Sequence, residues 1–281
     1  MILIYILIII AIVVFFYYRN INSKIKQFFS SGVKGVSTTP EDFKIVYEPV
    51  FFRSSDGLDL AGWFVPKIDG ESDTTVVVCP NPKGNKSDAL KETYFLANHF
   101  NVFYFDFRAS GESKGGSFYY GLYEWKDISA VMDFLKSFRA DESKNIILYS
   151  LGEASFASLL FANRSDILPD AVILKSPCLD YAGFIKVYIK SKLKMHFVPD
   201  FILRKYIKPI NTIDLKNIAE RTKSLLLFVY TKKEKEINDL YNALNSSKKD
   251  RIIIESDKEI NICNDEIVRK ISKIVSNKLV I

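Results

Sequence analysis

The stretch NIILYSLGEASFASLLFA, from Asn145 to Ala162, places three kinds of local structure in direct succession. NIILY is an apolar run that suits a buried strand, and EASFASLLFA has the composition of a helix. Between them the residues Ser150-Leu151-Gly152-Glu153 include small side chains that favour a tight turn. A strand followed at once by a helix is the building unit of α/β domains, so this stretch predicts that class of fold.

The same alternation continues along the rest of the chain. Two β-rich runs flank Asp56-Gly57, the dipeptide that best fits a tight hairpin. Further predicted strands are TTVVVCP (74–80), NVFYFDF (101–107), DAVILK (170–175), SLLLFVY (224–230) and DRIIIE (250–255). Further predicted helices are DALKETYFLANHF (88–100), YEWKDISAVMDFLKSF (123–138), INDLYNALN (237–245) and DEIVRKISKIVSN (265–277). Strands that alternate with helices predict a mostly parallel central sheet with helices on both faces.

Several of these segments resemble one large superfamily. The segments that carry the resemblance are SSDGLDLAGWFVP (Ser54 to Pro66), VFYFDFRASGES (Val102 to Ser113), GLYEWKDISAVMDFL and SLLLFVYTKKE. The turn from Asp106 to Ser113 resembles the pattern D-x-R-G-x-G-x-S, with Ala109 in place of one glycine. The chain is therefore similar to the α/β-hydrolase superfamily, and most similar to its membrane-anchored esterase-, thioesterase- and serine-peptidase-like branch. The resemblance covers about residues 45 to 275 and implies the α/β-hydrolase fold, although fold alone does not decide function.

The nucleophile position of such a hydrolase is a G-x-S-x-G turn between strand and helix. Aligned without gaps, Ser150 stands where the first glycine belongs, Gly152 where the nucleophile belongs and Ala154 where the last glycine belongs. Glycine tolerates the left-handed backbone of that turn, which favours this alignment. The other alignment makes Ser150 the nucleophile and places Leu148 at a crowded position that requires glycine.

The other parts of the catalytic machinery also depart from the pattern. The loop after the last strand should supply a histidine, but it contains Ser256, Asp257, Lys258, Glu259 and Asn261, so that Glu259 is the candidate at the histidine position. His99 precedes a strand on the wrong side of the turn, and His196 lies in a basic segment. Glu234 is the candidate for the acid, although Lys233 aligns there equally well. Pro80 and Pro82 have no N–H to donate to an oxyanion.

The amino-terminal run MILIYILIIIAIVVFFYY, from Met1 to Tyr18, is long enough to span a bilayer as a helix. It lacks the basic start and the small-residue cleavage site of a signal peptide, so we expect a retained transmembrane anchor over residues 1–19. Positive charge follows the run at Arg19, Lys24, Lys26 and Lys34, which predicts a cytoplasmic globular domain. Residues 20–44 are expected to link the anchor to a hydrolase-like domain over residues 45–281.

Composition limits the other functional classes. The net charge of +6 is spread along the chain, and no zinc-type spacing or nucleic-acid motif accompanies it, so neither nucleic acid nor a metal or other cofactor is expected. The three cysteines are far apart and odd in number, which favours reduced thiols. A cap segment at about 183–208 carries basic residues from Lys186 to Lys208, interleaved with apolar ones. It is either an ordinary cap helix with solvated lysines or a surface for anionic lipid, beside the lipid contact of residues 2–18.

Together these observations favour a single-pass membrane protein whose hydrolase-like domain is catalytically inactive and serves as a binding or scaffolding module. The alternative is an active serine hydrolase that uses Ser150, with a lysine or His196 as its base. A third hypothesis is a lipid-surface binder that acts through the cap. The position of Ser150 and Gly152 relative to the turn decides between the first two.

Overall fold

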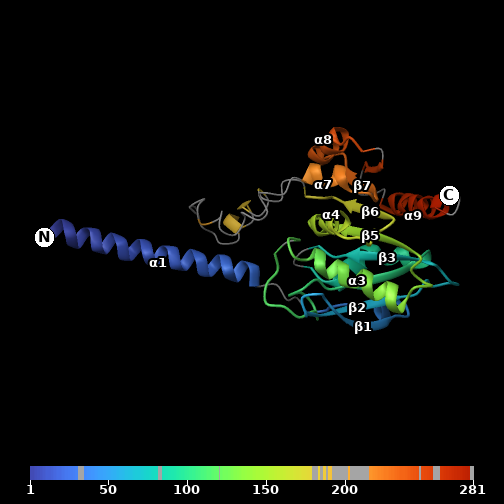
Figure 1. Ribbon diagram of the computed structural model, residues 1–281, viewed down its shortest axis with the longest axis horizontal. Helices are drawn as coiled ribbons and strands as arrows, with labels where there is room; N and C mark the ends of the chain where they lie inside the picture. Colours follow the sequence, from blue (N-terminus) through green and yellow to red (C-terminus); the bar gives the residue numbers. More distant parts are fainter. Residues whose placement is uncertain are drawn as a thin grey trace.

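The computed structural model describes residues 1–30, 35–81, 84–119, 121–178, 183, 186–187, 189–191, 202, 215–246, 248–255 and 260–278. In these ranges the chain forms a long amino-terminal helix and a domain built on one sheet (Figure 1). Its helices and 3-10 helices are α1 (Ile2–Ser30), η1 (Pro40–Phe43), α2 (Lys86–Thr93), η2 (Tyr94–Asn98), α3 (Trp125–Phe138), α4 (Ala154–Arg164), α7 (Leu215–Arg221), α8 (Lys235–Ala243) and α9 (Ile260–Lys278).

The sheet has eight strands in the order β1-β2-β4-β3-β5-β6-β7-β8. They are β1 (Glu48–Arg53), β2 (Asp59–Val65), β3 (Thr74–Cys79), β4 (Asn101–Phe105), β5 (Asn145–Leu151), β6 (Ala171–Lys175), β7 (Leu225–Thr231) and β8 (Lys249–Ile254). Strand β2 pairs antiparallel with β1 and β4, and all other pairs are parallel. The predicted hairpin joins β1 to β2, and Gly57 in its turn has a φ of +85°. The expected fold class is confirmed.

Helices cover both faces of this sheet. Helices α3, α4, α7 and α8 pack on one face, and α2, η2 and α9 pack on the other (Figure 1). Strand β3 shows the consequence for the sequence, because Val77 packs with the first group while Val76 and Val78 pack with the second. Such strands are continuously apolar since each buried valine contributes about 1.5–3 kcal/mol of hydrophobic free energy wherever it points.

Parallel strands end at a common edge, and this edge positions the site. We call the side where β3 to β8 end the carboxyl edge, and the opposite side the amino edge. In open α/β sheets ligands bind outside the carboxyl ends of the strands. The turn after β5, the loops after β3 and β4, and the turn after β7 all lie on the carboxyl edge.

Helix α1 extends beyond the expected anchor into the segment expected to link it to the domain. Its segment Ile2–Gln27 is long and apolar enough to cross a membrane, judged by length and composition. The helix continues unbroken to Ser30, and within the linker predicted for residues 20–44 the side chains of Ile21, Ile25 and Phe29 are buried in the domain core. The sequence alone does not indicate this burial. Three apolar residues spaced four apart form one helical face, which is inconspicuous among the polar residues around it.

The predicted cap segment at 183–208 falls largely outside the described residues. In its described part, Ile189 is buried in the domain core, Lys186 is partly exposed and Lys190 is exposed. His196 and all of the basic residues from Lys192 to Lys208 lie outside the described residues. The proposal that this segment contacts anionic lipid therefore keeps its basis in the sequence.

Candidate functional site

The turn after β5 has glycine at its tip. Strand β5 ends at Leu151, and Gly152 follows with a φ of +55° in the left-handed region that favours glycine. The Gly152 N–H donates to the carbonyl oxygen of Lys175 at 2.9 Å, which ties the turn to the end of β6. Helix α4 starts at Ala154, directly after the turn. Gly152 is partly exposed, so solvent reaches the tip of this turn.

The side chain of Asn81 occupies the space above that glycine. Asn81 lies in the loop after β3, and its Nδ2 atom would be only 2.4 Å from a Cβ atom placed on Gly152. A side chain at residue 152 would therefore collide with the amide. In this geometry the volume where a nucleophile's side chain would project is filled by the carboxamide of Asn81.

Ser150 points away from the turn and into the core. The residue is fully buried, and its hydroxyl donates to the Ser158 hydroxyl on α4 at 2.7 Å. The Ser158 hydroxyl in turn donates to the thiol of Cys79 at 3.6 Å, and burial raises the pKa of that thiol to about 12. These partners are neutral at physiological pH, and none of them is a base that would take the proton of a serine nucleophile.

Glu234, the candidate acid, closes a turn at the end of β7. Its Oε2 atom accepts hydrogen bonds from the Thr231 N–H at 2.7 Å, from the Thr231 hydroxyl at 2.8 Å and from the Ser176 hydroxyl at 3.3 Å. The carboxylate thus stands on the carboxyl edge, and its oxygen is engaged by its own turn and by the residue after β6. Lys233, the alternative at this position, is exposed.

The histidine position falls outside the described residues. Residues 256–259 of the loop after β8, including Glu259, belong to the part of the chain that the structure does not describe. His99 is the one histidine among the described residues. It is exposed after η2, just before β4 begins, and so lies on the amino edge. His99 is therefore on the opposite side of the sheet from Gly152.

The described polar groups of the loop after β3 bond within the loop, to the start of α2 and to the segment that follows α1. The Gly84 N–H donates to the Asn81 carbonyl at 2.8 Å, and the Asn85 side chain caps α2 by accepting from the Ser87 N–H at 2.9 Å. The Asn85 amide also donates to the Gly35 carbonyl at 3.1 Å. The backbone N–H groups of Ser37 and Thr38 both donate to the Ser87 hydroxyl. The segment that follows α1 therefore lies against the loop that supplies oxyanion donors in hydrolases.

Behind this loop lies an ion pair that sequence reasoning missed. Lys86 and Asp106 are both completely buried, and the Lys86 ammonium donates to the Asp106 carboxylate at 2.5 Å and to Glu112 at 2.6 Å. The ammonium also stands 4.9 Å from the centre of the Trp63 ring. Asp106 belongs to the D-x-R motif, so the signal was present, but only the fold shows that its partner is a lysine twenty residues earlier.

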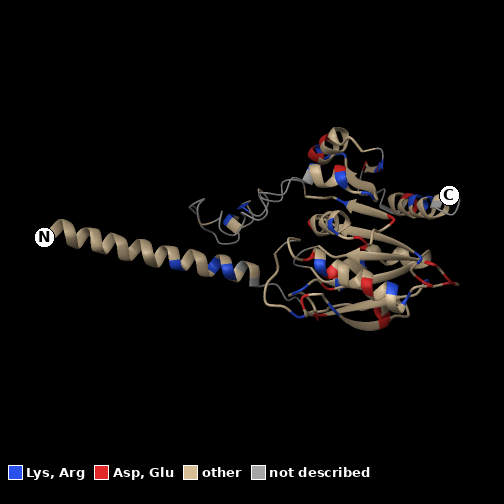
Figure 2. Cartoon of the chain, viewed as in Figure 1, with Lys and Arg blue, Asp and Glu red and all other residues tan. Residues whose placement is uncertain are grey.

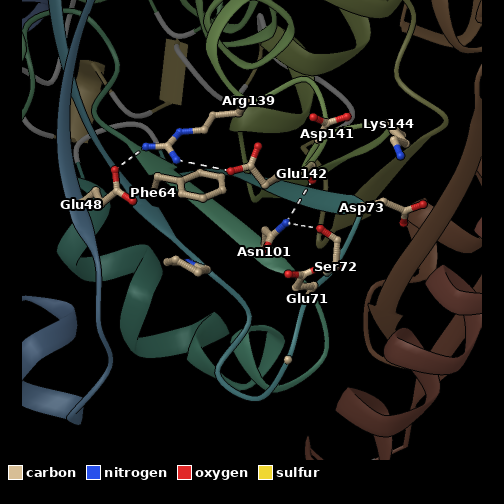
Figure 3. Close-up of a pocket in the computed structure, with 12 residues that line it drawn as sticks. Glu48, Phe64, Glu71, Ser72, Asp73, Asn101, Arg139, Asp141, Glu142 and Lys144 are labelled. Carbon is tan, nitrogen blue, oxygen red and sulfur yellow. Dashed lines mark hydrogen bonds and ion pairs between the residues drawn. The ribbon is translucent and has the colours of Figure 1, made fainter.

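A cavity of about 770 Å³ lies on the other side of the sheet (Figure 3). Its polar side chains bond to one another, as Figure 3 shows for Arg139 with Glu48 and Glu142. Asn101 donates to the carbonyl groups of Ser72 and Glu142. Most of the lining residues begin β4 or precede β3 and β5, and the others come from the start of β1 and the end of the antiparallel strand β2, so this cavity is on the amino edge, away from Gly152. Over the described residues, no group of three His, Cys, Asp or Glu side chains is placed to hold a metal ion.

Comparison with known proteins gives the same picture of the fold. The chain is 27% identical over 192 residues to the Alpha/beta hydrolase domain-containing protein WAV2 of Arabidopsis thaliana, covering 64% of this chain and 61% of that protein. The esterase Pf2001 of Pyrococcus furiosus superimposes with a TM-score of 0.66 at 21% identity, covering 89% of this chain and 97% of the esterase. The chain has the α/β-hydrolase fold, and its sequence is similar to that of an α/β-hydrolase domain protein.

Further relatives leave the chemistry of the site open. The protein YfhR of Escherichia coli K12 is 28% identical over 141 residues, which are 48% of this chain and 49% of YfhR. The chain thus spans about half to three fifths of the length of these curated relatives. No family model matches it. The esterase is a relative in fold, and its activity is a property of that protein.

Proposed function

We propose that this protein does not hydrolyse esters and serves instead as a membrane-tethered binding or scaffolding module. One observation carries the proposal: Gly152 holds the left-handed tip of the turn after β5, with the Asn81 amide seated above it. A serine hydrolase needs a hydroxyl at this tip. The shape of the turn is retained here, and the group that would react is replaced by hydrogen.

The surrounding residues support the same proposal. Removal of a general base alone costs about 10²–10⁴-fold in rate, and the members of a triad act as a unit. Ser150 is the rival nucleophile, but its hydroxyl is buried and bonded to Ser158. An active enzyme based on Ser150 would require β5 to move so that this hydroxyl leaves the core. The esterase likeness favours that rival, because the fold itself is compatible with ester hydrolysis.

The proposed arrangement places residues 1–19 in the membrane and residues 45–281 in the cytoplasm. The apolar stretch of α1 supports the anchor, and the positive charge that follows it supports the orientation. Residues 2–18 are the proposed lipid contact. The buried face of Ile21, Ile25 and Phe29 means that the intact chain is the right material for any assay.

The test is activity-based labelling of the full-length protein with a fluorophosphonate probe, paired with hydrolysis of a short-chain p-nitrophenyl ester. We expect neither labelling nor hydrolysis above the level of heat-denatured protein. Labelling that disappears in Ser150→Ala would establish the rival enzyme and overturn the proposal. Esterase Pf2001 under identical conditions serves as the positive control for probe and substrate.

A further inference from the structure

The end of α1 is built into the domain. Ile21 and Ile25 are fully buried and Phe29 is 5% exposed, whereas residues 1–18 of the same helix are exposed throughout. The three buried residues are spaced four apart, so they form one face of the helix. Arg19 and Lys26 are exposed and Lys24 is half-buried, and all three fall outside this buried face. One continuous helix therefore changes at about residue 20 from a lipid-type surface to a protein-core surface.

The contacts of this docked end lead to the carboxyl edge. The Phe118 N–H donates to the Phe29 carbonyl at 2.7 Å, and the Phe29 ring stacks on Tyr119 with 5.8 Å between centroids. Both partners lie in the segment that follows β4. A Cβ atom on Gly121, in the same segment, would lie 2.6 Å from the Phe156 ring of α4. Three close contacts thus connect α1 to the helix that begins beside Gly152.

A buried carboxylate holds this connecting segment in shape. Glu124 is completely buried and accepts from the backbone N–H groups of Tyr119 at 2.8 Å, Gly121 at 2.6 Å and Tyr123 at 3.3 Å. On the other side of the docked end, residues Gly35 to Thr38 bond to Asn85 and Ser87. The junction between α1 and the domain is therefore fixed from two sides, and both sides belong to the carboxyl edge.

Helix α1 is continuous from Ile2 to Ser30, so no flexible segment separates the bilayer from this junction. A hydrocarbon core of about 30 Å takes about 20 helical residues at about 1.5 Å each. Residues 2–20 fill that span, and Ile21 is already in the domain core. Figure 1 shows α1 leaving the domain on the side of the loop after β4, and Figure 2 marks acidic residues in the loops at the opposite end of the domain.

We propose that the docked end of α1 holds the domain with its carboxyl edge, including Gly152 and Asn81, against the headgroup surface of the bilayer. The partner of this edge is the lipid surface itself, and the exposed cations Arg19 and Lys26 at the junction suit lipid phosphates. The amino edge and its acidic cavity face away from the membrane. The inference rests on the proposed anchor and is independent of whether the protein hydrolyses esters.

Energy transfer to the membrane tests this orientation. A donor dye is placed at Gly116→Cys on the carboxyl edge or at Lys144→Cys on the amino edge, in full-length protein carrying Cys178→Ala. A Cβ at residue 116 meets open space, and Lys144 is exposed. Cys79 and Cys263 are buried, and the unlabelled background variant checks that they stay unmodified. The acceptor is a headgroup-labelled lipid in vesicles of phosphatidylcholine and phosphatidylserine.

We expect the position at residue 116 to transfer energy several-fold more efficiently than the position at residue 144. Strand β5 alone separates the two edges by about 23 Å, at about 3.3 Å for each of its seven residues. A flexible six-residue Gly/Ser insertion between Asn20 and Ile21 leaves the anchor and the docked face intact, and it should equalise the two positions. Ile25→Asp, which places a carboxylate on the buried face, should have the same effect.

Three results would overturn the orientation. They are equal transfer from both positions in the chain without the insertion, stronger transfer from residue 144, or no effect of the insertion. Loss of the protein from the vesicles in an alkaline wash would instead show that α1 is no anchor, which overturns the proposed tethering as well. Ester hydrolysis by protein that passes the orientation test would refute the proposed inactivity alone.

Discussion

A side chain introduced at residue 152 probes the geometry on which the proposed function depends. The perturbations are Gly152→Ala and Gly152→Ser, each made with and without Asn81→Ala. Alanine adds only the Cβ atom, and serine adds the hydroxyl that the superfamily uses as its nucleophile. The two substitutions together separate the cost of accommodating a side chain from the benefit of a reactive group.

Two terms set the expected loss of stability. A non-glycine residue in the left-handed region costs about 1–2 kcal/mol, and Gly152 has a φ of +55°. A Cβ there would stand 2.4 Å from Asn81 Nδ2, whereas ordinary contact begins at 3.4 Å, so the amide must move. Asn81 is exposed, and displacing its side chain from a rotamer costs about 0.5–1.5 kcal/mol. The sum of about 1.5–3.5 kcal/mol corresponds to a lower Tm by about 3–14 °C for a domain of this size.

The assay is thermal unfolding of the full chain in one detergent, with ester hydrolysis measured on the same samples. We expect Gly152→Ala and Gly152→Ser to lower the Tm equally, and Asn81→Ala to restore the part that comes from the collision. Neither variant should hydrolyse the ester. Asn81→Ala alone should change the Tm little, because the Asn81 side chain is exposed. This single variant is the control for the residue 152 variants made with and without Asn81→Ala.

Two outcomes would show that the reasoning is wrong. An unchanged Tm in Gly152→Ser would mean that the backbone of the turn is not left-handed or that the space above it is empty. Hydrolysis by Gly152→Ser, absent from Gly152→Ala, would mean that a working base lies within reach of residue 152. In that case the site lacks only its hydroxyl, and the proposed loss of the whole catalytic machinery is refuted.

Two further predictions concern buried charges. Lys86→Met should lower the free energy of unfolding, measured by chemical denaturation, by about 3–5 kcal/mol, because it leaves Asp106 buried without its cation. The double variant Lys86→Met with Asp106→Asn should recover part of the lost stability. A double variant as unstable as Lys86→Met alone would contradict the mechanism. Burial raises the pKa of Glu124 from 4.5 to about 7, so the folded state binds a proton more tightly than the unfolded state does. Proton binding by Glu124 therefore stabilises the folded state fully below pH 4.5, and this stabilisation is lost as the pH rises through 7. The wild-type chain should therefore lose about 3 kcal/mol between pH 4.5 and pH 8 through this group, at about 1.4 kcal/mol per pKa unit, and Glu124→Gln should lack that component; an identical pH profile in both would contradict the assignment.

Local patterns were enough to predict an α/β fold with a mostly parallel sheet, and the resemblance of motifs such as Asp106 to Ser113 to a known superfamily implied the hydrolase fold. Apolar runs such as that of β3 can only be buried on both faces, the Asp56-Gly57 dipeptide favours one kind of turn, and strands in alternation with helices permit few topologies. The absence of a serine at residue 152 in the gapless alignment also follows from sequence spacing. These features depend on neighbouring residues, so they are visible in the linear chain.

The tertiary structure alone decided which distant groups meet. Asn81 lies above Gly152 because the loop after β3 and the turn after β5 share the carboxyl edge, although about seventy residues separate them. The direction of the Ser150 hydroxyl depends on the pairing of β5 with its neighbours and on the position of α4, and it puts the only serine of the turn into the core. The docking of α1 depends on contacts such as those of Phe29 with Phe118 and Tyr119, which lie about ninety residues later. Contacts of this kind are set by packing across the fold, and no local pattern encodes them.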